Sequence, residues 1–299
     1  MNRKRVTAIA LAGTLICSPI FSIADGVIAY AADNRFNGEE WYDQIETVEL
    51  NREPARATFT PYKDAGQALA AEKTVFDDVD ETSSPYYQTL NGDWSFKFAQ
   101  KPADREKQVF GQAAAEYVEN WNTSTWDTIK VPSSIQAQKD ENGDFKYEKP
   151  LYVNQIYPWA NYETVNYHTN GTNKPVAPTV NNSVGQYKRT FTVPEDWDGR
   201  QVFVSFQGVE SAFYLYINGQ RVGYAEDSYT VDEFNITDYL KEGENTIAVE
   251  VYRWSTGSYL ENQDFIRLSG IFRDVYLYSK NDVELRDFFV TTDLDETYT

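Results

Sequence analysis

The stretch from Gly185 to Ser279 constrains the fold most, because one short pattern of alternating apolar and polar residues recurs along it. The runs QYKRTFTV, QVFVSFQGV, SAFYLYI and NTIAVEVY have the period of two that turns one side of a strand toward a core. Asn218-Gly219 separates two strand-like runs, and both residues tolerate the positive φ angles of a tight hairpin. Short strands with a turn about every 8–12 residues predict an antiparallel β-sandwich.

The same alternation assigns side chains to faces within the expected strands. Ile247, Val249 and Val251 are expected on one face of NTIAVEVY. Earlier in the chain, LNGDWSFKFA has the same period, which is typical of a strand with one buried side. Its residues expected to share one face are Trp94, Phe96 and Phe98. The FNITDYL run after the hairpin predicts a single helical turn or a corner.

Several common enzyme classes find no support in this chain. There is no strand–helix alternation, no glycine-rich phosphate loop, and no H-E-x-x-H or G-x-S-x-G motif. His168 is the only histidine, and no nucleophile motif lies beside it. It lies in a long stretch rich in Asn, Tyr and Pro, from Gln136 to Ser183, which we interpret as an ordered excursion over one face of the domain. Such excursions tend to be functional.

Charge narrows the range of partners. The formal net charge is -19, and 15% of the residues are aromatic. An acidic chain is repelled by nucleic acids and by anionic membranes, so we expect neither as a partner. Neutral ligands and cations are compatible with this charge. The aromatic content suits both a β-sheet core and sugar recognition, and the core is the more common reason for it.

Residues 1–31 resemble a secretory signal peptide. A basic start is followed by an apolar run and then by the small-residue pair Ala29 and Ala31, an A-x-A cleavage pattern. Cys17, the only cysteine, lies inside this segment. We therefore predict a secreted bacterial protein, extracellular or on the cell surface, whose mature chain has no disulfide.

The two ends of the remaining chain differ from its middle. Residues 32–86 read as an irregular polar extension that packs on the sandwich, with a helix-like patch from Gln67 to Lys73. The acidic run from Asp77 to Glu81 indicates a solvated loop. At the other end, VELRDFFVTTDL begins a new strand-like run at Val283, so residues 282–299 are expected to open a second domain.

One loop carries the strongest functional signal. The sequence RWSTGSYLENQD, residues 253–264, follows one expected strand and combines a Trp, a Gly and a Tyr with several amides and carboxylates. A solvated loop, a metal-binding loop and part of a sugar site all fit such a composition. Residue types alone leave these three interpretations open.

Long segments in order along the chain resemble the N-terminal region of secreted bacterial β-galactosidases of glycoside hydrolase family 2. The segments are ETVELNREPARATF, TLNGDWSFKF, KVPSSIQ, LYVNQIYPW, GVESAFYLYINGQRVGYAEDS and RWSTGSYLENQDFIRLSGIFRDVYL. The resemblance implies a jelly-roll, galactose-binding-like sandwich over residues 87–281 and the first strand of an immunoglobulin-like domain from residue 282. It also implies a downstream (β/α)8 barrel with both catalytic glutamates, which have no counterpart in this chain.

The resemblance implies two substrate-binding residues. Asn154 matches a family asparagine that reaches the galactose subsite, where an amide can both donate and accept hydrogen bonds. Asp264 matches a family aspartate that binds the galactosyl unit and helps to ligate sodium. A carboxylate suits both roles, because it accepts strongly from hydroxyls and is a hard oxygen ligand. Trp254 is expected to pack the loop, and Arg253, Arg267 and Arg273 to form ion pairs or contacts with the barrel.

A divalent cation is a weaker implication of the resemblance. Glu40, Asp43 and Glu226 match positions that hold a structural cation in relatives, and three carboxylates would suit magnesium or calcium. Thr256 stands where the family has an aspartate, and Asp43 replaces an amide, so this chain departs from the pattern.

The expected function is therefore that of the N-terminal part of a retaining β-galactosidase, acting on lactose-like substrates with terminal β-D-galactose. This domain would supply one wall of the galactose subsite, and the chain alone would be inactive. The alternatives are a stand-alone carbohydrate-binding module and a structural sandwich without activity.

Overall fold

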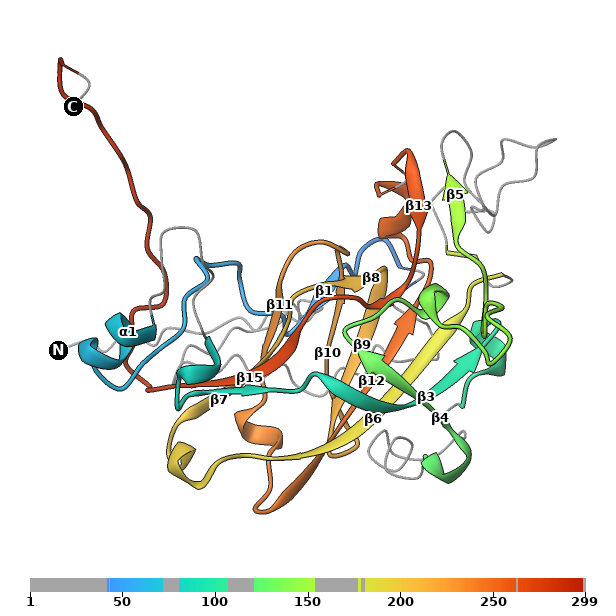
Figure 1. Cartoon of the computed structure of the whole chain (residues 1–299), viewed down its shortest axis with the longest axis horizontal. Helices are drawn as coiled ribbons and strands as arrows, with labels where there is room; N and C mark the ends of the chain where they lie inside the picture. The colour runs from blue at the N-terminus through green and yellow to red at the C-terminus, as the bar shows by residue number, and fades with distance from the viewer. Residues whose placement is uncertain are drawn as a thin grey trace, which may run out of the picture. The chain divides into compact units, whose positions relative to one another are not determined.

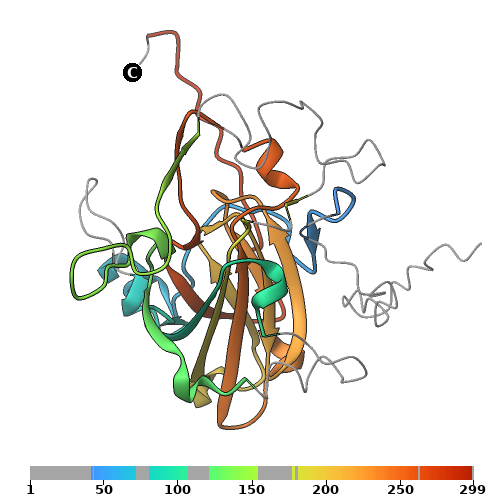
Figure 2. The same cartoon turned by 90° about the vertical axis from the view of Figure 1, so that its right-hand side faces the viewer.

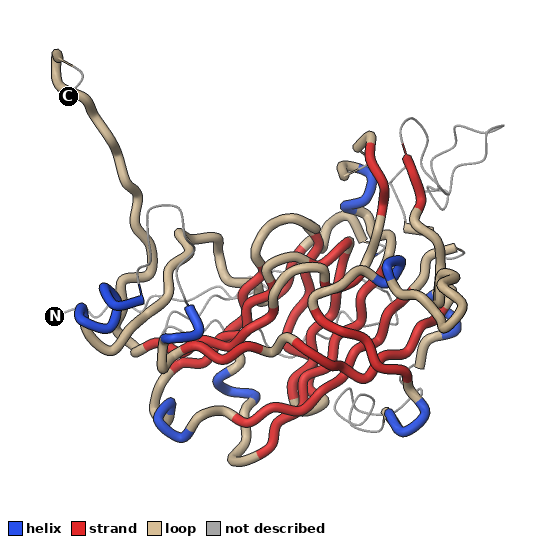
Figure 3. Tube along the Cα trace, in the orientation of Figure 1, coloured by secondary structure: helices blue, strands red, loops and turns tan. Residues whose placement is uncertain are grey.

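The computed structural model describes residues 42, 44–71, 81–106, 121–153, 177–178, 181–261 and 263–297. Over these residues the protein is built mainly from antiparallel strands (Figures 1 and 3). Their one α-helix is α1 (Ala65–Ala71), at the helix-like patch expected from Gln67. No helix among the described residues is long and apolar enough to cross a membrane. The 3-10 turns are η2 (Glu81–Ser83), η3 (Pro102–Asp104), η4 (Thr123–Thr125), η5 (Ile135–Ala137), η6 (Glu195–Trp197), η7 (Thr237–Tyr239) and η8 (Gly257–Tyr259).

The larger of the two main sheets has seven strands in the order β1-β10-β9-β12-β6-β3-β4, and every neighbouring pair is antiparallel. Long strands lie at its centre, and short ones lie at its edges. The strands are β1 (Glu49–Leu50), β3 (Gly92–Ala99), β4 (Asp127–Val131), β6 (Val184–Thr192), β9 (Ala212–Ile217), β10 (Gln220–Glu226) and β12 (Glu244–Tyr252).

The smaller main sheet has four strands in the order β11-β7-β15-β2, also antiparallel. Two minor sheets join β13 to β5 and β14 to β8. The strands are β2 (Tyr87–Thr89), β7 (Gln201–Phe206), β11 (Asp232–Asn235), β15 (Val275–Lys280), β5 (Leu151–Val153), β13 (Phe265–Arg267), β8 (Val209–Glu210) and β14 (Gly270–Ile271).

The core lies between the two main sheets and follows the predicted alternation. Ile247, Val249 and Val251 are fully buried in it and meet side chains of the smaller sheet such as Val204 and Leu277. Trp94 and Phe96 are buried there too, and Phe98 packs at its border. The predicted antiparallel sandwich and both of its face assignments are confirmed.

The outer face of the larger sheet is covered as well. A second cluster, mainly aromatic, contains Tyr214 and Tyr216 of β9, Tyr252 of β12 and Tyr42 of the N-terminal extension. Tyr42 stacks on Tyr252 with ring centroids 4.3 Å apart. Burial on both faces explains why SAFYLYI is almost continuously apolar, since neither side of β9 meets solvent.

The predicted turns are confirmed. Asn218 and Gly219 connect β9 to β10 with φ angles of 49° and 77°, the left-handed values that this hairpin requires. The FNITDYL run forms η7, the single turn expected at that corner. These local features place β10 beside β9, so that the end of β10 at Glu226 lies opposite Ala212.

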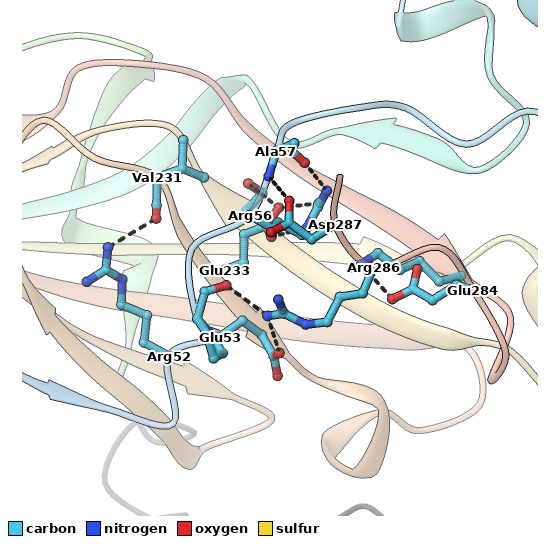
Figure 4. Close-up of polar contacts among 12 residues, drawn as sticks. Arg52, Glu53, Arg56, Ala57, Val231, Glu233, Glu284, Arg286 and Asp287 are labelled. Carbon is cyan, nitrogen blue, oxygen red and sulfur yellow. Dashed lines mark hydrogen bonds and ion pairs between the residues drawn. The ribbon is translucent and has the colours of Figure 1, made fainter. Parts of the chain in front are cut away.

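The N-terminal extension lies along the smaller sheet and is held there by an ion pair (Figure 4). The Arg56 Nε and Nη2 atoms each lie 2.9 Å from an oxygen of Glu233, next to Phe234 in β11. The guanidinium also lies 5.3 Å from the ring centroids of Phe59 and Tyr278. Arg56 and Phe59 of the extension therefore contact the sandwich at these residues.

The run from Val283 does not form the expected strand. Residues 281–297 have neither helix nor strand, although Ala57 N–H donates to Asp287 Oδ1 at 2.8 Å and Phe59 contacts Phe288 (Figures 3 and 4). A strand is defined by ladder hydrogen bonds to a neighbour, and none of the described strands pairs with this segment. Its assignment to a second domain stays a prediction.

Candidate functional site

The minor sheet of β5 and β13 stands apart from the two main sheets (Figures 1 and 3). Tyr152 in β5 pairs with Ile266 in β13, and both side chains are exposed, at 59% and 55%. Asp264 immediately precedes β13 and is also exposed. The loop identified in the sequence thus delivers its last residue to a small projecting sheet.

Tyr152 and Asp264 form a direct pair on this sheet. The Tyr152 hydroxyl donates to Asp264 Oδ1 at 2.6 Å, although the two residues are 112 positions apart in the sequence. No described residue donates to the second oxygen, Oδ2. An exposed carboxylate with one oxygen held and the other open can accept a ligand hydroxyl or bind a hard cation such as sodium.

Asn154, the other predicted sugar-binding residue, lies outside the described residues. The residue before it, Val153, pairs with Phe265, which is the residue after Asp264. The structure therefore brings the segments of the two predicted residues onto adjacent strands, although they are far apart in the sequence.

The start of the loop is anchored below this minor sheet. Trp254 is 3% exposed, and its backbone N–H donates to Asn182 Oδ1 at 2.9 Å. Arg253 Nη1 lies 2.5 Å from Glu148 Oε2. The other oxygen of Glu148 accepts from Gln136 at 2.6 Å and from Ser183 at 2.6 Å. Trp254 therefore packs the loop, as predicted, and Arg253 forms one of the expected ion pairs.

Arg267 joins several parts of the loop from within β13. Its side chain is 1% exposed, and its Nε lies 3.1 Å from Glu210 Oε1 while Nη2 lies 3.6 Å from Glu261 Oε2. Its guanidinium lies 5.7 Å from the Trp254 ring centroid. Burial raises the pKa of Glu210 to about 7, and Arg267 opposes the rise. This cluster fixes the position of β13, and so of Asp264, relative to β8.

Among the described residues, Glu226 accepts hydrogen bonds only from neutral groups. Its Oε1 receives the Tyr224 hydroxyl at 2.5 Å and the Thr256 hydroxyl at 3.0 Å. Its Oε2 receives the Ser255 hydroxyl at 3.2 Å and the backbone N–H of Gly257. Burial raises the pKa of Glu226 to about 7, although these hydrogen bonds oppose the rise.

These contacts do not fit the predicted divalent cation site. A carboxylate has about four lone-pair positions, and the four donors occupy both oxygens of Glu226. Thr256 acts as one of the donors and not as a ligand. Glu40 and Asp43 lie outside the described residues, and no group of three His, Cys, Asp or Glu that could hold a metal occurs within them. The divalent site stays a prediction.

The sequence did not reveal some residues that build this region. Tyr152 and Glu148 contact the loop, and Glu210 contacts β13, from segments distant in the sequence, and no local motif marks them. Arg273 donates to the Gln207 and Tyr229 carbonyls, and no ion pair of this residue is found among the described residues.

Comparison with known proteins identifies this architecture. Residues 87–281 match the family described as glycosyl hydrolases family 2, sugar binding domain. The chain is similar to a beta-galactosidase of Priestia megaterium, at 49% identity over 259 residues, covering 87% of this chain and 22% of that protein. It is also similar to beta-galactosidases of Halalkalibacterium halodurans (39%; 86% and 22% covered) and Clostridium acetobutylicum (38%; 87% and 25% covered).

The chain thus spans about a quarter or less of the length of these relatives. The family match covers every strand of the two main sheets except β1, and it includes the minor sheets and the loop of residues 253–264. The chain therefore belongs to glycoside hydrolase family 2, and residues 87–281 are the jelly-roll-like sugar-binding domain of that family.

Proposed function

We propose that this chain is the N-terminal part of a retaining β-galactosidase that hydrolyses terminal, non-reducing β-D-galactose residues, as in lactose. The names of its relatives support β-galactosides as the substrates. The exposed Tyr152–Asp264 pair is the observation that supports a sugar-binding site at this position. The sandwich supplies one wall of the galactose subsite, and a downstream (β/α)8 barrel supplies the rest.

Asp264 is the central residue of this wall. Its open oxygen accepts a galactose hydroxyl and ligates sodium, while Tyr152 holds the other oxygen in place. Asn154 adds an amide that can donate to one hydroxyl and accept from another. A retaining glycosidase breaks the bond with two carboxyl groups about 5–5.5 Å apart, one as nucleophile and one as acid/base. We assign both to the barrel and no catalytic residue to this chain.

The remaining expectations belong to the same proposal. Residues 1–31 direct export and are removed, residues 32–86 form the docked extension, and residues 282–299 begin an immunoglobulin-like domain before the barrel. The acidic charge of -19 favours a neutral sugar and a cation over nucleic acid or an anionic membrane as ligands.

The test uses the full-length protein and the 299-residue chain in parallel. Only the full-length protein should hydrolyse o-nitrophenyl galactoside. Asp264→Ala should lower its kcat/KM by about 10–100-fold and reduce its response to sodium, because a charge-assisted acceptor is lost. Asp238→Ala, an exposed change on η7, is the control and should be silent. Turnover by the 299-residue chain, or an Asp264→Ala variant with normal rate and sodium response, would refute the proposal.

A further inference from the structure

Two carboxylates connect the end of β10 to the loop of residues 253–264. One belongs to β10 and accepts from the loop, and the other belongs to the loop and accepts from the segment after β10. Glu226, the last residue of β10, accepts hydrogen bonds from Thr256 and Gly257 in the loop. Glu261, in the loop, accepts hydrogen bonds from Ser228, which follows β10. We call these two interactions together the reciprocal latch.

The Glu226 half of the latch is a buried carboxyl group, and no side chain among the described residues pairs with it as a counter-ion. Glu226 is 5% exposed, and each of its oxygens receives at least two of the hydrogen bonds described above. Leaving a buried carboxylate without donors is costly, so the loop must keep its hydroxyls and its amide in place to satisfy it. Gly257 permits the close approach, because a Cβ at that position would lie 2.6 Å from Glu226 Oε2.

The Glu261 half fixes the other end of the loop. Ser228 donates through its backbone N–H to Oε1 and through its hydroxyl to Oε2, each at 2.7 Å. Asp227, between the two latch segments, has a φ of 95°, a left-handed value that few residues other than glycine adopt. The backbone is therefore strained at Asp227, where the chain turns from Glu226 to Ser228.

The latch leads directly to Asp264 on one side and to the extension on the other. Glu261 precedes Asp264 in the sequence, and Arg267 follows it. The Glu261 carbonyl accepts a hydrogen bond from Arg267, so the two residues join the chain on either side of Asp264. On the far side, Thr256 N–H donates to the Tyr42 carbonyl at 3.0 Å, and Glu226 N–H to the Val48 carbonyl at 2.9 Å. In Figure 2 the start of the described extension, in blue, lies on the same side of the sandwich as the short orange helix of the loop, in agreement with these contacts.

We propose that Glu226 and Glu261 are positioning residues of the sugar subsite. Their reciprocal latch holds the loop so that Asp264 meets its ligand, and it does so with hydroxyl and amide donors in place of a metal ion. The positioning role rests on the proposed function, whereas the latch itself is a property of the chain and can be tested alone.

Hydrogen–deuterium exchange of the 299-residue chain tests the latch. Glu226→Ala should speed exchange at the Gly257 amide and across residues 255–261 by about tenfold, because the acceptor of that amide is lost. Glu226→Gln should restore part of the protection, since its carbonyl can still accept from Gly257. Gly257→Ala should have the same effect as Glu226→Ala, because the added Cβ displaces the carboxylate.

Val249→Ala is the matched control, because it destabilises the main core without touching the loop. Its exchange should rise evenly over the sandwich and not selectively at residues 255–261. Unchanged loop exchange in Glu226→Ala would overturn the latch. A second result would also overturn it: magnesium slows loop exchange in the wild-type chain but not in Glu226→Ala. Glu226 would then be a metal ligand.

The positioning role is then measured in the full-length protein. Glu226→Gln and Glu261→Gln should raise KM and the sodium requirement several-fold, while kcat falls less. The control Val249→Ala should leave KM, kcat and the sodium requirement unchanged. Loosened exchange with normal KM and sodium response would make the latch purely structural and refute the positioning role. If the full-length protein hydrolyses no β-galactoside, the proposed function fails, and the exchange experiment still decides the latch.

Discussion

Two buried carboxylates of this sandwich are stabilised in opposite ways. Glu233, on the outer face of the smaller sheet, faces the guanidinium of Arg56 in a two-pronged ion pair (Figure 4). Glu226, at the end of β10, accepts from hydroxyls and one backbone amide, and no charged donor reaches it within the described part of the chain. Both are less than 10% exposed, so each must be satisfied by protein groups.

The difference matters because the two kinds of partner respond differently to loss of the carboxylate. A buried guanidinium keeps its charge when its partner is removed, and an unpaired buried charge is strongly destabilising. Hydroxyls can rotate toward other acceptors or water. The Arg56–Glu233 pair is thus suited to fastening the extension permanently. The Glu226 cluster is suited to a loop whose exact position matters for a ligand.

The largest effect is expected for Glu233→Ala. This change leaves the charged Arg56 side chain, which is 5% exposed, without its partner. It should lower the free energy of unfolding by about 3–5 kcal/mol. Glu226→Ala should cost less, about 1–3 kcal/mol, because it leaves only neutral donors unsatisfied. Urea unfolding of the 299-residue chain measures both.

Asp93→Ala is a suitable control for these two variants, because Asp93 pairs with Lys130 where both side chains are more than half exposed. It should change stability by less than about 1 kcal/mol. If Glu233→Ala were no worse than Asp93→Ala, the Arg56–Glu233 pair would not fasten the extension. If Glu226→Ala were the more damaging of the two, the contrast drawn above would be wrong.

The sequence predicted much of the framework in which these clusters lie. Alternation placed Ile247, Val249 and Val251 in the core, because burial on one face of a strand follows directly from a period of two. The hairpin at Asn218-Gly219 was predictable for a similar reason, since its conformation depends on local residues. The loop of residues 253–264 was also identified from its composition, although only resemblance to a family favoured the sugar-site interpretation over the others.

Side-chain partners brought together by the fold were not predictable from the sequence. Tyr152 meets Asp264 only because β5 pairs with β13, and no local pattern specifies that pairing. Glu226 was interpreted as a metal ligand because it matches a position that holds a cation in relatives, whereas its donors from Ser255 to Gly257 become visible only when the loop is folded against β10. The alternation after Val283 predicted a strand, but a strand also requires a partner.

The second prediction concerns the pH dependence that Glu226 contributes to stability. A carboxyl whose pKa is higher in the folded chain binds its proton more tightly there. Its stabilising contribution is present below the ordinary pKa of 4.5 and is lost as pH rises through about 7. For Glu226 this loss is on the order of 3 kcal/mol.

Unfolding free energies of the wild-type chain and of Glu226→Gln, measured between about pH 5 and about pH 9, test this expectation. The wild type should lose stability across the range, and Glu226→Gln should lose less, because Gln does not titrate. Glu210, whose pKa burial also raises to about 7, contributes equally to both curves. Parallel curves for the two proteins would show that Glu226 stays ionised in the fold throughout this range.

The smallest effect is expected where the extension meets the segment after β15 on the surface. Arg286 Nη2 lies 3.6 Å from Glu53 Oε2 and donates to the Pro54 carbonyl at 2.8 Å, with both side chains about a third or more exposed. Arg286→Ala should lower the free energy of unfolding by less than about 1 kcal/mol, and added salt should shrink the difference further by screening the pair. Urea unfolding at low and high salt measures it. A loss as large as that of Glu233→Ala, unaffected by salt, would mean that the segment from residue 284 to 288 is as much a part of the fastening as Arg56.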